Sequence, residues 1–322
     1  MGKELRQTIK KITSHHLKKN KSQVFGQNLT GVGWVAGTLP KLFEKDGVIE
    51  LPMADVAGGG IVTGSALMGK RPIYIIRYQG YNWFNCIFIV NYACKSNAIW
   101  KIPCPMMIRG ISSEGSIGPV AGSAHISTIY KMPGLKIFSP MTNKEYSNVY
   151  KNFMKSKDVF YISEHRSSYS NTKEFKNDLT GNKDIILMPI SVTRFAAEKA
   201  KLILEKKSFS VGIIHLVNLK PFLIKSEWIK AIKKSKFGVL MTDNDYADGI
   251  FRILAHQINE KTNKPVSVLG LDDKTAGHHK KVDNLPPNEL KYHEKYNKKM
   301  TERIKVNWGT TKFHVWTPID GN

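Results

Sequence analysis

Cysteine is scarce in this sequence, and that limits the metal and disulfide chemistry the chain can support. Its 322 residues include three cysteines, Cys86, Cys94 and Cys104. The number is odd, and no two of them have the spacing of a Cys-x-x-Cys motif. Zinc sites and disulfide frameworks are built from paired arrangements of that kind. We therefore expect three reduced, mostly buried thiols and no metal ligands in this chain.

Long hydrophobic runs are also missing. The longest apolar stretch, residues 84–94, is interrupted by Asn85 and Asn91, whereas a membrane-spanning helix needs roughly 18 apolar residues in a row. The first 21 residues lack the apolar segment of a secretory signal. The Met-Gly start has Arg6 where a myristoylation motif requires Ser or Thr. The sequence thus predicts a cytoplasmic protein that does not bind membranes.

Acidic residues are few relative to basic ones. There are 26 Asp and Glu against 49 Lys and Arg, which gives a net charge of +23. Such an excess can indicate nucleic-acid binding. Here the basic residues are mostly lysines spread over the whole length, and no arginine-rich arm, zinc finger or aromatic RNA-binding pattern accompanies them. We interpret the charge as a lysine-rich solvated surface that favours anionic substrates or an acidic partner, and we expect no nucleic-acid partner.

Apolar segments alternate between strand-like and helix-like patterns, and a chain of this length suggests about two domains. In the first half we expect strands at 24–26, 72–76, 105–109, 135–138 and 159–163, and helices at 4–19, 54–69, 83–95 and 145–155. Residues 83–95 are expected to form a buried helix. Strands that alternate with helices imply an α/β fold with a parallel, doubly wound sheet.

A polar stretch at residues 170–183 divides the chain. It is rich in Asn, Asp and Gly and is the best linker candidate. After it we expect strands at 185–188, 211–216, 238–241 and 266–269, and helices at 194–205, 228–233 and 250–260. The predicted domains are therefore residues 1–178 and residues 183–322, each doubly wound α/β.

Glycine-rich phosphate motifs do not occur in a suitable context. The sequence has no G-x-G-x-x-G after a strand, no P-loop and no H-E-x-x-H. The run Gly58-Gly59-Gly60 lies inside the expected helix 54–69 and not at a turn from strand to helix. We therefore interpret it as a surface for close packing against neighbouring backbone.

A series of segments follows one known pattern, which begins at residues 51–57 (LPMADVA) and continues through 60–72 (GIVTGSALMGKRP). These segments resemble the E1 β subunits of 2-oxo-acid dehydrogenases. The likeness resumes at 132–140 (MPGLKIFSP) and at 159–166 (VFYISEHR), and residues 217–221 (VNLKP) extend it into the second half. Each motif is weak alone, but their order and spacing from about residue 4 to residue 290 are specific.

The resemblance implies a transketolase-like pyrimidine-binding domain followed by a transketolase C-terminal domain, and thiamine diphosphate as cofactor. It places Asp55 where the family has a glutamate that holds a proton on N1′ of the aminopyrimidine, a step that helps to activate the cofactor. Aspartate is one methylene shorter, so the backbone must lie closer. The alternative is that Asp55 only caps the helix that follows it.

Three further positions follow from the same resemblance. Tyr81 falls where the family stacks an aromatic ring on the pyrimidine, although it could be an ordinary core residue. Gln27 lies near a turn where a family glutamate reaches the active site, and an amide cannot act as an acid. The catalytic histidine of the family aligns with Ala121. His125 lies one turn later if this segment is helical, so it could replace that imidazole or be structural.

The diphosphate-binding motif of the family, Gly-Asp-Gly with a downstream Asn, is absent. The resemblance therefore implies that Mg²⁺ and the diphosphate are held mainly by an α-like partner chain, in an α2β2 assembly. The implied function is that of an E1 β subunit that decarboxylates a 2-oxo acid and passes the fragment to a lipoyl E2 protein. The alternatives are the C-terminal half of a split transketolase acting on sugar phosphates, or a catalytically degenerate structural or regulatory subunit.

Overall fold

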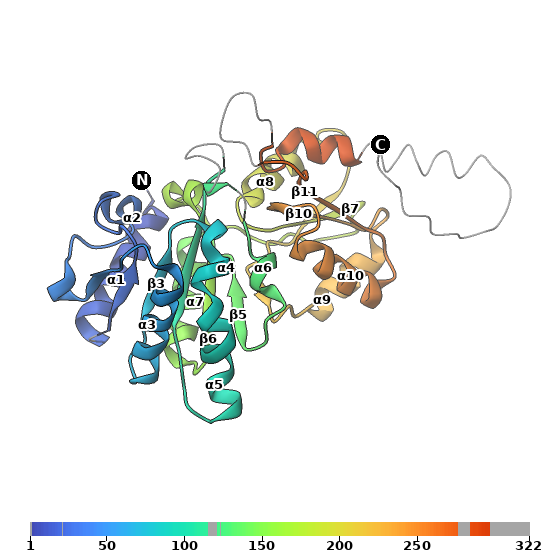
Figure 1. Cartoon of the computed structure of the whole chain (residues 1–322). Helices are drawn as coiled ribbons and strands as arrows, with labels where there is room; N and C mark the ends of the chain where they lie inside the picture. The colour runs from blue at the N-terminus through green and yellow to red at the C-terminus, as the bar shows by residue number, and fades with distance from the viewer. Residues whose placement is uncertain (1, 21, 115–120, 123, 276–283, 297–322) are drawn as a thin grey trace.

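Two mainly parallel β-sheets with helices on both faces make up the protein (Figure 1). The computed structural model describes residues 2–20, 22–114, 121–122, 124–275 and 284–296. The first sheet has seven strands in the order β2-β1-β3-β4-β6-β5-β9, and the second has four in the order β11-β10-β7-β8. The predicted α/β fold class is confirmed.

The first sheet is parallel except at one edge, where β5 pairs with β9 in the antiparallel direction. Its strands are β1 (Val24–Gly26), β2 (Val48–Glu50), β3 (Ile73–Ile76), β4 (Met107–Ser112), β5 (Leu135–Phe138), β6 (Val159–His165) and β9 (Asn218–Lys220). β9 comes from the second half of the chain and was not predicted. β2 was not predicted as a strand either. The other five strands lie at or near the segments predicted from the sequence.

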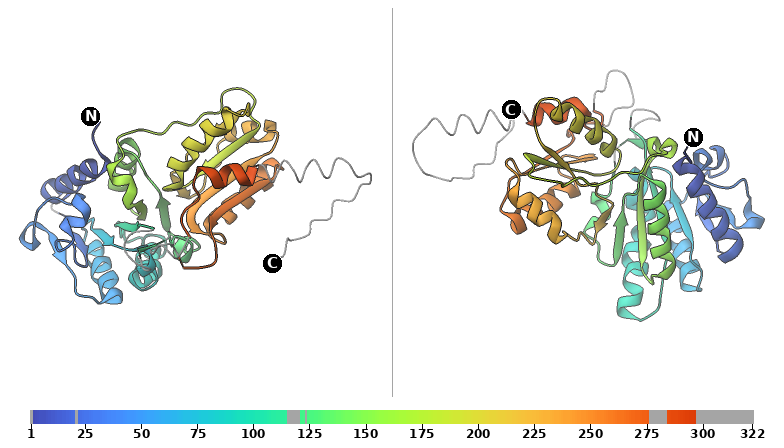
Figure 2. Two further views of the ribbon diagram at one scale, coloured as in Figure 1. Left: turned by 90° about the horizontal axis from the view of Figure 1, so that it is seen from above. Right: turned by 180° about the vertical axis from the view of Figure 1, so that it is seen from behind.

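Both faces of this sheet are buried, as its continuous apolar strands require. Along β3, Ile73 and Ile75 pack toward α1 (Leu5–Asn20) and α7 (Asn143–Lys155). Tyr74 and Ile76 pack on the opposite face, toward α3 (Asp55–Leu67). Figure 2 shows α1 and α7 from behind, whereas α3 lies on the front in Figure 1. The shorter helices around this sheet are α2 (Gly33–Gly37), α4 (Asn82–Asn85), α5 (Cys94–Ile99) and α6 (Ser127–Tyr130), with 3₁₀ turns at Glu44–Asp46, Gln79–Tyr81 and Arg166–Ser170.

The glycine run of α3 serves close packing. A Cβ atom on Gly59 would lie 2.3 Å from the carbonyl oxygen of Asn85, and one on Gly58 would lie 2.8 Å from the hydroxyl of Tyr74. Side chains at these positions would push α3 away from α4 and from the sheet. The packing interpretation of Gly58 and Gly59 is confirmed.

The prediction of one buried helix at 83–95 was wrong in two respects. The segment is divided into α4, a π-helical turn at Ile89–Ala93 and the start of α5. One side is buried through Cys86 and Ile89, but the other carries Trp83 with 64% and Phe84 with 54% of their surface exposed. Apolar composition alone does not distinguish a face that packs in the core from one that lies open. The three cysteines are free and buried, as predicted.

The second sheet contains β7 (Ile185–Pro189), β8 (Val211–Ile213), β10 (Val239–Tyr246) and β11 (Val266–Leu271), all parallel. Its helices are α8 (Thr193–Glu205), α9 (Ser226–Lys234) and α10 (Ile250–Thr262), and residues 289–296 are also helical. Each strand and helix predicted after residue 183 has its counterpart here. No helix in the described ranges is long and apolar enough to cross a membrane.

Buried polar contacts join the two sheets. Arg194 at the start of α8 pairs with Glu145 of α7, with N–O distances of 2.5 and 2.9 Å. The predicted linker, residues 170–183, runs between β6 and β7, and its Asp178 forms a bridge with Ile213 of the second sheet. The proposed boundaries at residues 178 and 183 stay predictions.

Candidate functional site

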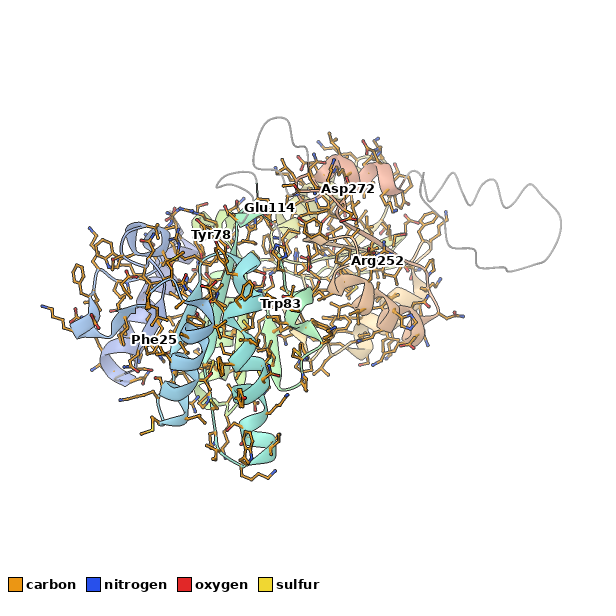
Figure 3. All side chains as sticks on the ribbon, in the orientation of Figure 1. Phe25, Tyr78, Trp83, Glu114, Arg252 and Asp272 are labelled. Carbon is orange, nitrogen blue, oxygen red and sulfur yellow. The ribbon has the colours of Figure 1, made fainter. Side chains whose placement is uncertain are left out.

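The carboxyl ends of the parallel strands gather the polar side chains of the first domain. Gln27 follows β1, Arg77 follows β3 and Arg166 follows β6. Tyr78 and Glu114 lie at this same edge (Figure 3). Open parallel sheets bind their ligands in the crevice outside the carboxyl ends of the strands. Two adjoining cavities occupy this position.

The first cavity, which we name the pyrimidine cavity after the group that the sequence analysis expects near Gln27 and Tyr81, has a volume of about 140 Å³. Its lining combines polar groups with aliphatic and aromatic surface: Gln27, Asn28, Met53, Ile75, Ile76, Arg77, Tyr78, Tyr81 and Asn85. Two of the residues predicted to bind the cofactor, Gln27 and Tyr81, therefore face the same space.

Asp55 is joined to this cavity through Gln27. The Nε2 atom of Gln27 donates a hydrogen bond to Oδ1 of Asp55 over 2.5 Å. Asp55 is the first residue of α3, where the helix dipole favours a carboxylate. The N-cap of that helix is Ala54 and no side chain caps it, so the capping alternative for Asp55 was wrong. Within the described chain the Gln27 bond is the one side-chain hydrogen bond of Asp55, and Oδ2 is left to accept another.

Tyr81 is held by the short turns around it. It ends the 3₁₀ turn Gln79–Tyr81, its ring lies 6.2 Å from that of Tyr78, and its carbonyl accepts a hydrogen bond from Asn85 over 2.9 Å. The hydroxyl of Tyr74 donates to the amide oxygen of the same Asn85. This fixed arrangement presents one half-buried aromatic ring to the pyrimidine cavity.

His125 lies elsewhere. It does not line the pyrimidine cavity, and its ring is 6.0 Å from that of Tyr246 at the end of β10. Its backbone is anchored by Gln79, which accepts from the His125 N–H over 3.0 Å, and by Asn82, which donates to its carbonyl over 3.3 Å. Burial lowers the pKa of the imidazole. The structure thus places His125 in the seam between the two sheets.

The condition for Ala121 and His125 to share a helical face, a helix over this segment, is not met in the residues that the structure describes here. α6 begins only at Ser127, and neither Ala124 nor His125 belongs to a helix. The side chain of Ala121 is buried, so the position where the family has its histidine faces the protein interior. The four-residue spacing between Ala121 and His125 therefore does not place their side chains on one face.

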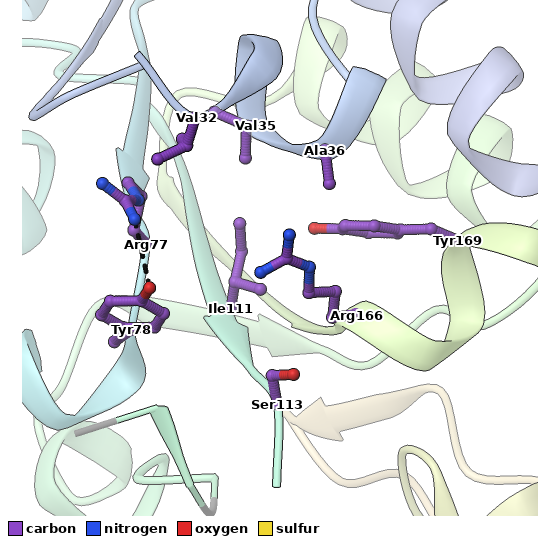
Figure 4. A pocket seen from close by; sticks show the side chains of 9 residues that line it. All are labelled: Val32, Val35, Ala36, Arg77, Tyr78, Ile111, Ser113, Arg166 and Tyr169. Carbon is purple, nitrogen blue, oxygen red and sulfur yellow. Dashed lines mark hydrogen bonds between the residues drawn. The ribbon is translucent and has the colours of Figure 1, made fainter. Parts of the chain in front are cut away.

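The second cavity, named here the arginine cavity, has a volume of about 200 Å³ and adjoins the first (Figure 4). It is lined by Val32, Val35, Ala36, Arg77, Tyr78, Ile111, Ser113, Arg166 and Tyr169. Arg77 and Tyr78 belong to both cavities. The sequence analysis missed Arg77 and Arg166, although each directly follows a strongly apolar strand, a position that could have marked them.

A buried ion pair supports this region from within the core. Arg109 of β4 donates to both carboxylate oxygens of Glu164 over 2.7 and 2.9 Å. The hydroxyls of Tyr146 and Tyr169 donate to the same carboxylate over 2.8 and 2.6 Å. Glu164 is therefore fully engaged, and its bond fixes the ring of Tyr169 in the wall of the arginine cavity.

A second cluster, which the sequence analysis also missed, joins β10 to the first domain. Glu114 hydrogen-bonds to His165 and accepts from Asn244 over 2.7 Å, while Asp245 accepts from the hydroxyl of Ser127 over 2.5 Å. Burial raises the pKa of the Asp245 carboxyl to about 6. Despite these acidic groups, the described residues contain no set of three or more His, Cys, Asp or Glu side chains arranged to hold a metal ion.

Known proteins share this sequence pattern. The family described as "Transketolase, pyrimidine binding domain" matches residues 3–172. The β subunit of 2-oxoisovalerate dehydrogenase from Bacillus subtilis is 26% identical over 263 residues, which is 74% of this chain and 78% of that protein. The pyruvate dehydrogenase E1 component subunit β from Staphylococcus epidermidis is 25% identical over 275 residues, 79% of this chain and 84% of that one.

Solved structures share the fold. One, titled "Split gene transketolase, inactive beta4 tetramer", superimposes with a TM-score of 0.66 at 16% identity, covering 85% of this chain and 90% of that one. Transketolase from Campylobacter jejuni superimposes with a TM-score of 0.67 at 12% identity over 95% of this chain. This chain spans about half of that transketolase, 47% of its length.

Proposed function

The chain belongs to the transketolase pyrimidine-binding domain family, and on that premise we propose that it is the β-like subunit of a thiamine-diphosphate-dependent 2-oxo-acid dehydrogenase (E1). It would decarboxylate a 2-oxo acid together with a separate α-like subunit. The β subunits from B. subtilis and S. epidermidis support this by similarity along most of their length. The observation that carries the proposal is that Gln27 and Tyr81 line one cavity and that Gln27 is hydrogen-bonded to Asp55.

The residues of the pyrimidine cavity fit an aminopyrimidine ring. Tyr81, Ile75 and Met53 offer apolar surface to a flat ring, and Oδ2 of Asp55 is open to a ring N–H. When bound, thiamine diphosphate supplies a nucleophilic carbon that makes the bond next to a carbonyl breakable. Asp55 would hold a proton at N1′ of the aminopyrimidine, and the bond from Gln27 would orient the carboxylate. Tyr81 would contact the face of the ring.

The rest of the site would come from the partner. The sequence has no Gly-Asp-Gly motif, and no metal-binding cluster occurs in the described ranges. We assign Mg²⁺ and the diphosphate to an α-like chain in an α2β2 assembly, and the acyl fragment to a lipoyl E2 protein. His125 is proposed as an acid–base residue only if the assembly brings substrate to the seam between the sheets.

Calorimetry tests the cofactor site. Thiamine diphosphate with Mg²⁺ is titrated into the chain alone and into the chain co-expressed with the α-like protein of its own genome that carries the Gly-Asp-Gly motif. We expect tight binding in the complex only, and its loss in Asp55→Ala. Asp46→Ala, in an exposed 3₁₀ turn, is the control and should bind as the wild type does. Unchanged binding in Asp55→Ala would rule out the assigned role of Asp55.

The runner-up is the C-terminal half of a split transketolase. The arginine cavity favours it, because paired guanidiniums bind phosphate as well as carboxylate. Turnover assays with the assembled complex separate the two. Release of CO₂ from a 2-oxo acid supports the dehydrogenase, whereas ketol transfer between sugar phosphates supports the transketolase. If the complex binds the cofactor but catalyses neither reaction, the chain is a catalytically degenerate subunit.

A further inference from the structure

The arginine cavity contains two cationic side chains that no acidic residue of the described ranges neutralises. Arg77 donates to neutral groups, the carbonyl of Asn28 over 3.5 Å and the hydroxyl of Tyr78 over 3.1 Å. Within the described chain, the side chain of Arg166 makes no hydrogen bond or ion pair, and no carboxylate lies within 4 Å of either guanidinium. The cavity therefore carries positive charge that its own lining does not balance.

The carboxylates that could have served these arginines are engaged elsewhere. Glu164, the second-to-last residue of β6, is bound by Arg109 and two tyrosine hydroxyls. Glu50 accepts from the backbone N–H groups of Leu29 and Thr30 over 2.9 and 2.7 Å. Two cations beside one cavity repel each other, and apolar walls strengthen that repulsion. An anion from outside the chain would relieve it.

The walls of the cavity hold the arginines in place. The guanidinium of Arg77 lies over the ring of Tyr78, 5.2 Å from its centre, a cation–π contact. Arg166 extends into the space from the opposite side, between Ile111 and Tyr169 (Figure 4). Aliphatic surface from Val32 and Val35 covers the remaining side.

One wall has an unusual backbone. Trp34, Val35 and Ala36 have φ angles of 52°, 52° and 53°, between Gly33 at 66° and Gly37 at 75°. This left-handed turn is sterically disfavoured for residues other than glycine. Strained backbone of this kind concentrates at ligand sites. The strained turn thus gives a second, independent sign that this cavity serves a ligand.

We propose that the arginine cavity binds the anionic group of the substrate, a carboxylate or a phosphate, next to the cofactor. The planar guanidinium fork matches both groups. The volume of 200 Å³ is below the roughly 300 Å³ of a whole small-molecule site, so it suits one group of a larger molecule. Arg77 and Tyr78 line both cavities and would bring that group beside the pyrimidine. The inference rests on the proposed function for the identity of the molecule.

Ligand-observed NMR titrations test this with the full chain, alone and in its complex. The probes are pyruvate, 2-oxoisovalerate, ribose 5-phosphate and inorganic phosphate. We expect one class to bind, with Kd raised about tenfold or more in Arg77→Gln and in Arg166→Gln, because a charged hydrogen bond is lost. Arg166→Lys should recover part of the affinity. Tighter binding of the oxo acids identifies a carboxylate subsite, and tighter binding of the phosphates identifies a phosphate subsite.

Arg252→Gln is the matched control. Arg252 is an exposed arginine of α10 that pairs with Asp248 over 3.0 Å, away from the cavity, and its replacement should leave Kd unchanged. Thermal melts confirm that each variant is folded. Equal Kd values in wild type, Arg77→Gln and Arg166→Gln would overturn the proposal. A second result would also overturn it: no anion binds to the wild type, and both variants assemble more weakly with the α-like chain. The cavity would then be a contact with the partner protein.

The same variants separate this inference from the function proposed above. If the complex binds thiamine diphosphate but the Kd for the anion is the same in wild type and in both arginine variants, the anion subsite alone is refuted. Arginine-dependent anion binding in a complex that never binds thiamine diphosphate would refute the dehydrogenase function alone.

Discussion

His16 is a buried histidine whose neighbour in sequence, His15, is exposed. The Nε2 atom of His16 lies 2.7 Å from the carbonyl of Arg71, and Nδ1 lies 2.9 Å from the hydroxyl of Tyr150. A carbonyl only accepts, so Nε2 carries the proton and the hydroxyl donates to Nδ1. This neutral tautomer satisfies both nitrogens, and burial lowers the pKa of His16 to about 4.

The buried histidine should make stability depend on pH. Because the pKa of His16 is lower in the folded than in the unfolded state, its contribution is complete above about pH 6.5 and is lost as the pH falls toward 4. Between pH 7.5 and pH 5 we expect the free energy of unfolding to fall by about 2 kcal/mol for this reason. Urea denaturation should show a flatter pH dependence in His16→Gln and an unaltered one in His15→Gln. Parallel curves for wild type and His16→Gln would contradict the assignment.

At the residue scale, some site residues could be predicted from the sequence and others could not. Asp55 stands within a resembling segment and Tyr81 lies at a fixed distance after it, so the resemblance indicated both, and the structure brings them to one edge of the sheet. The resemblance gave no role to Arg77 or Arg166, although Arg166 ends one of its segments, and only the sheet order shows that the ends of β3 and β6 face one cavity. The location of His125 depends on an irregular turn, whose conformation periodicity does not predict.

At the scale of elements, α3 can lie close to α4 and the sheet because Gly58 and Gly59 have no side chains. Gly59 faces the backbone of α4, whereas no atom lies within 4 Å of a Cβ built on Gly64 in the same helix. The two positions thus differ in the room around them and not in the kind of element. They form a matched pair for testing how closely α3 is packed.

Alanine should have opposite effects at these two positions. Gly59→Ala would force α3 away from the carbonyl of Asn85, and we expect it to lower the free energy of unfolding by about 1–3 kcal/mol. Gly64→Ala should raise that free energy by about 0.5–1 kcal/mol, because alanine loses less backbone freedom in a helix. Urea denaturation of both variants measures the difference. Equal effects of the two alanines would show that α3 is not held by close contact at Gly59.

The sequence predicted the elements of this fold well where they are regular. Apolar runs such as Ile73–Ile76 and Ile185–Pro189 form strands because both faces of a parallel sheet are buried. It did not predict β9, because three residues that pair with a strand some eighty positions earlier carry no local periodicity. It also missed the break between α4 and α5, where an apolar segment passes through a π-helical turn.

At the scale of the whole molecule, one apolar surface lies open. It extends over α3, α4, the π-helical turn and α5, which follow one another or pack together. We name it the outer apolar face, and its exposed members are Val56, Ile61, Trp83, Phe84, Ile87, Phe88, Tyr92, Ile99 and Trp100. Trp83 is labelled in Figure 3, and 64% of its surface is exposed. Monomeric proteins rarely expose a contiguous apolar surface of this kind, and such surfaces mark protein interfaces.

The proposed α-like partner should therefore depend on this surface. We expect the double variant Trp83→Lys, Phe84→Lys to lose the mass of the complex in light scattering after gel filtration, because two charges would have to be buried unpaired at the interface. Its thermal stability should stay near that of the wild type, since both side chains are more than half exposed. Leu202→Lys on α8, where Leu202 is 61% exposed, adds a lysine to apolar surface on the other domain and should assemble normally. A complex of unchanged mass in the double variant would mean that the partner binds elsewhere and that the outer apolar face has another occupant.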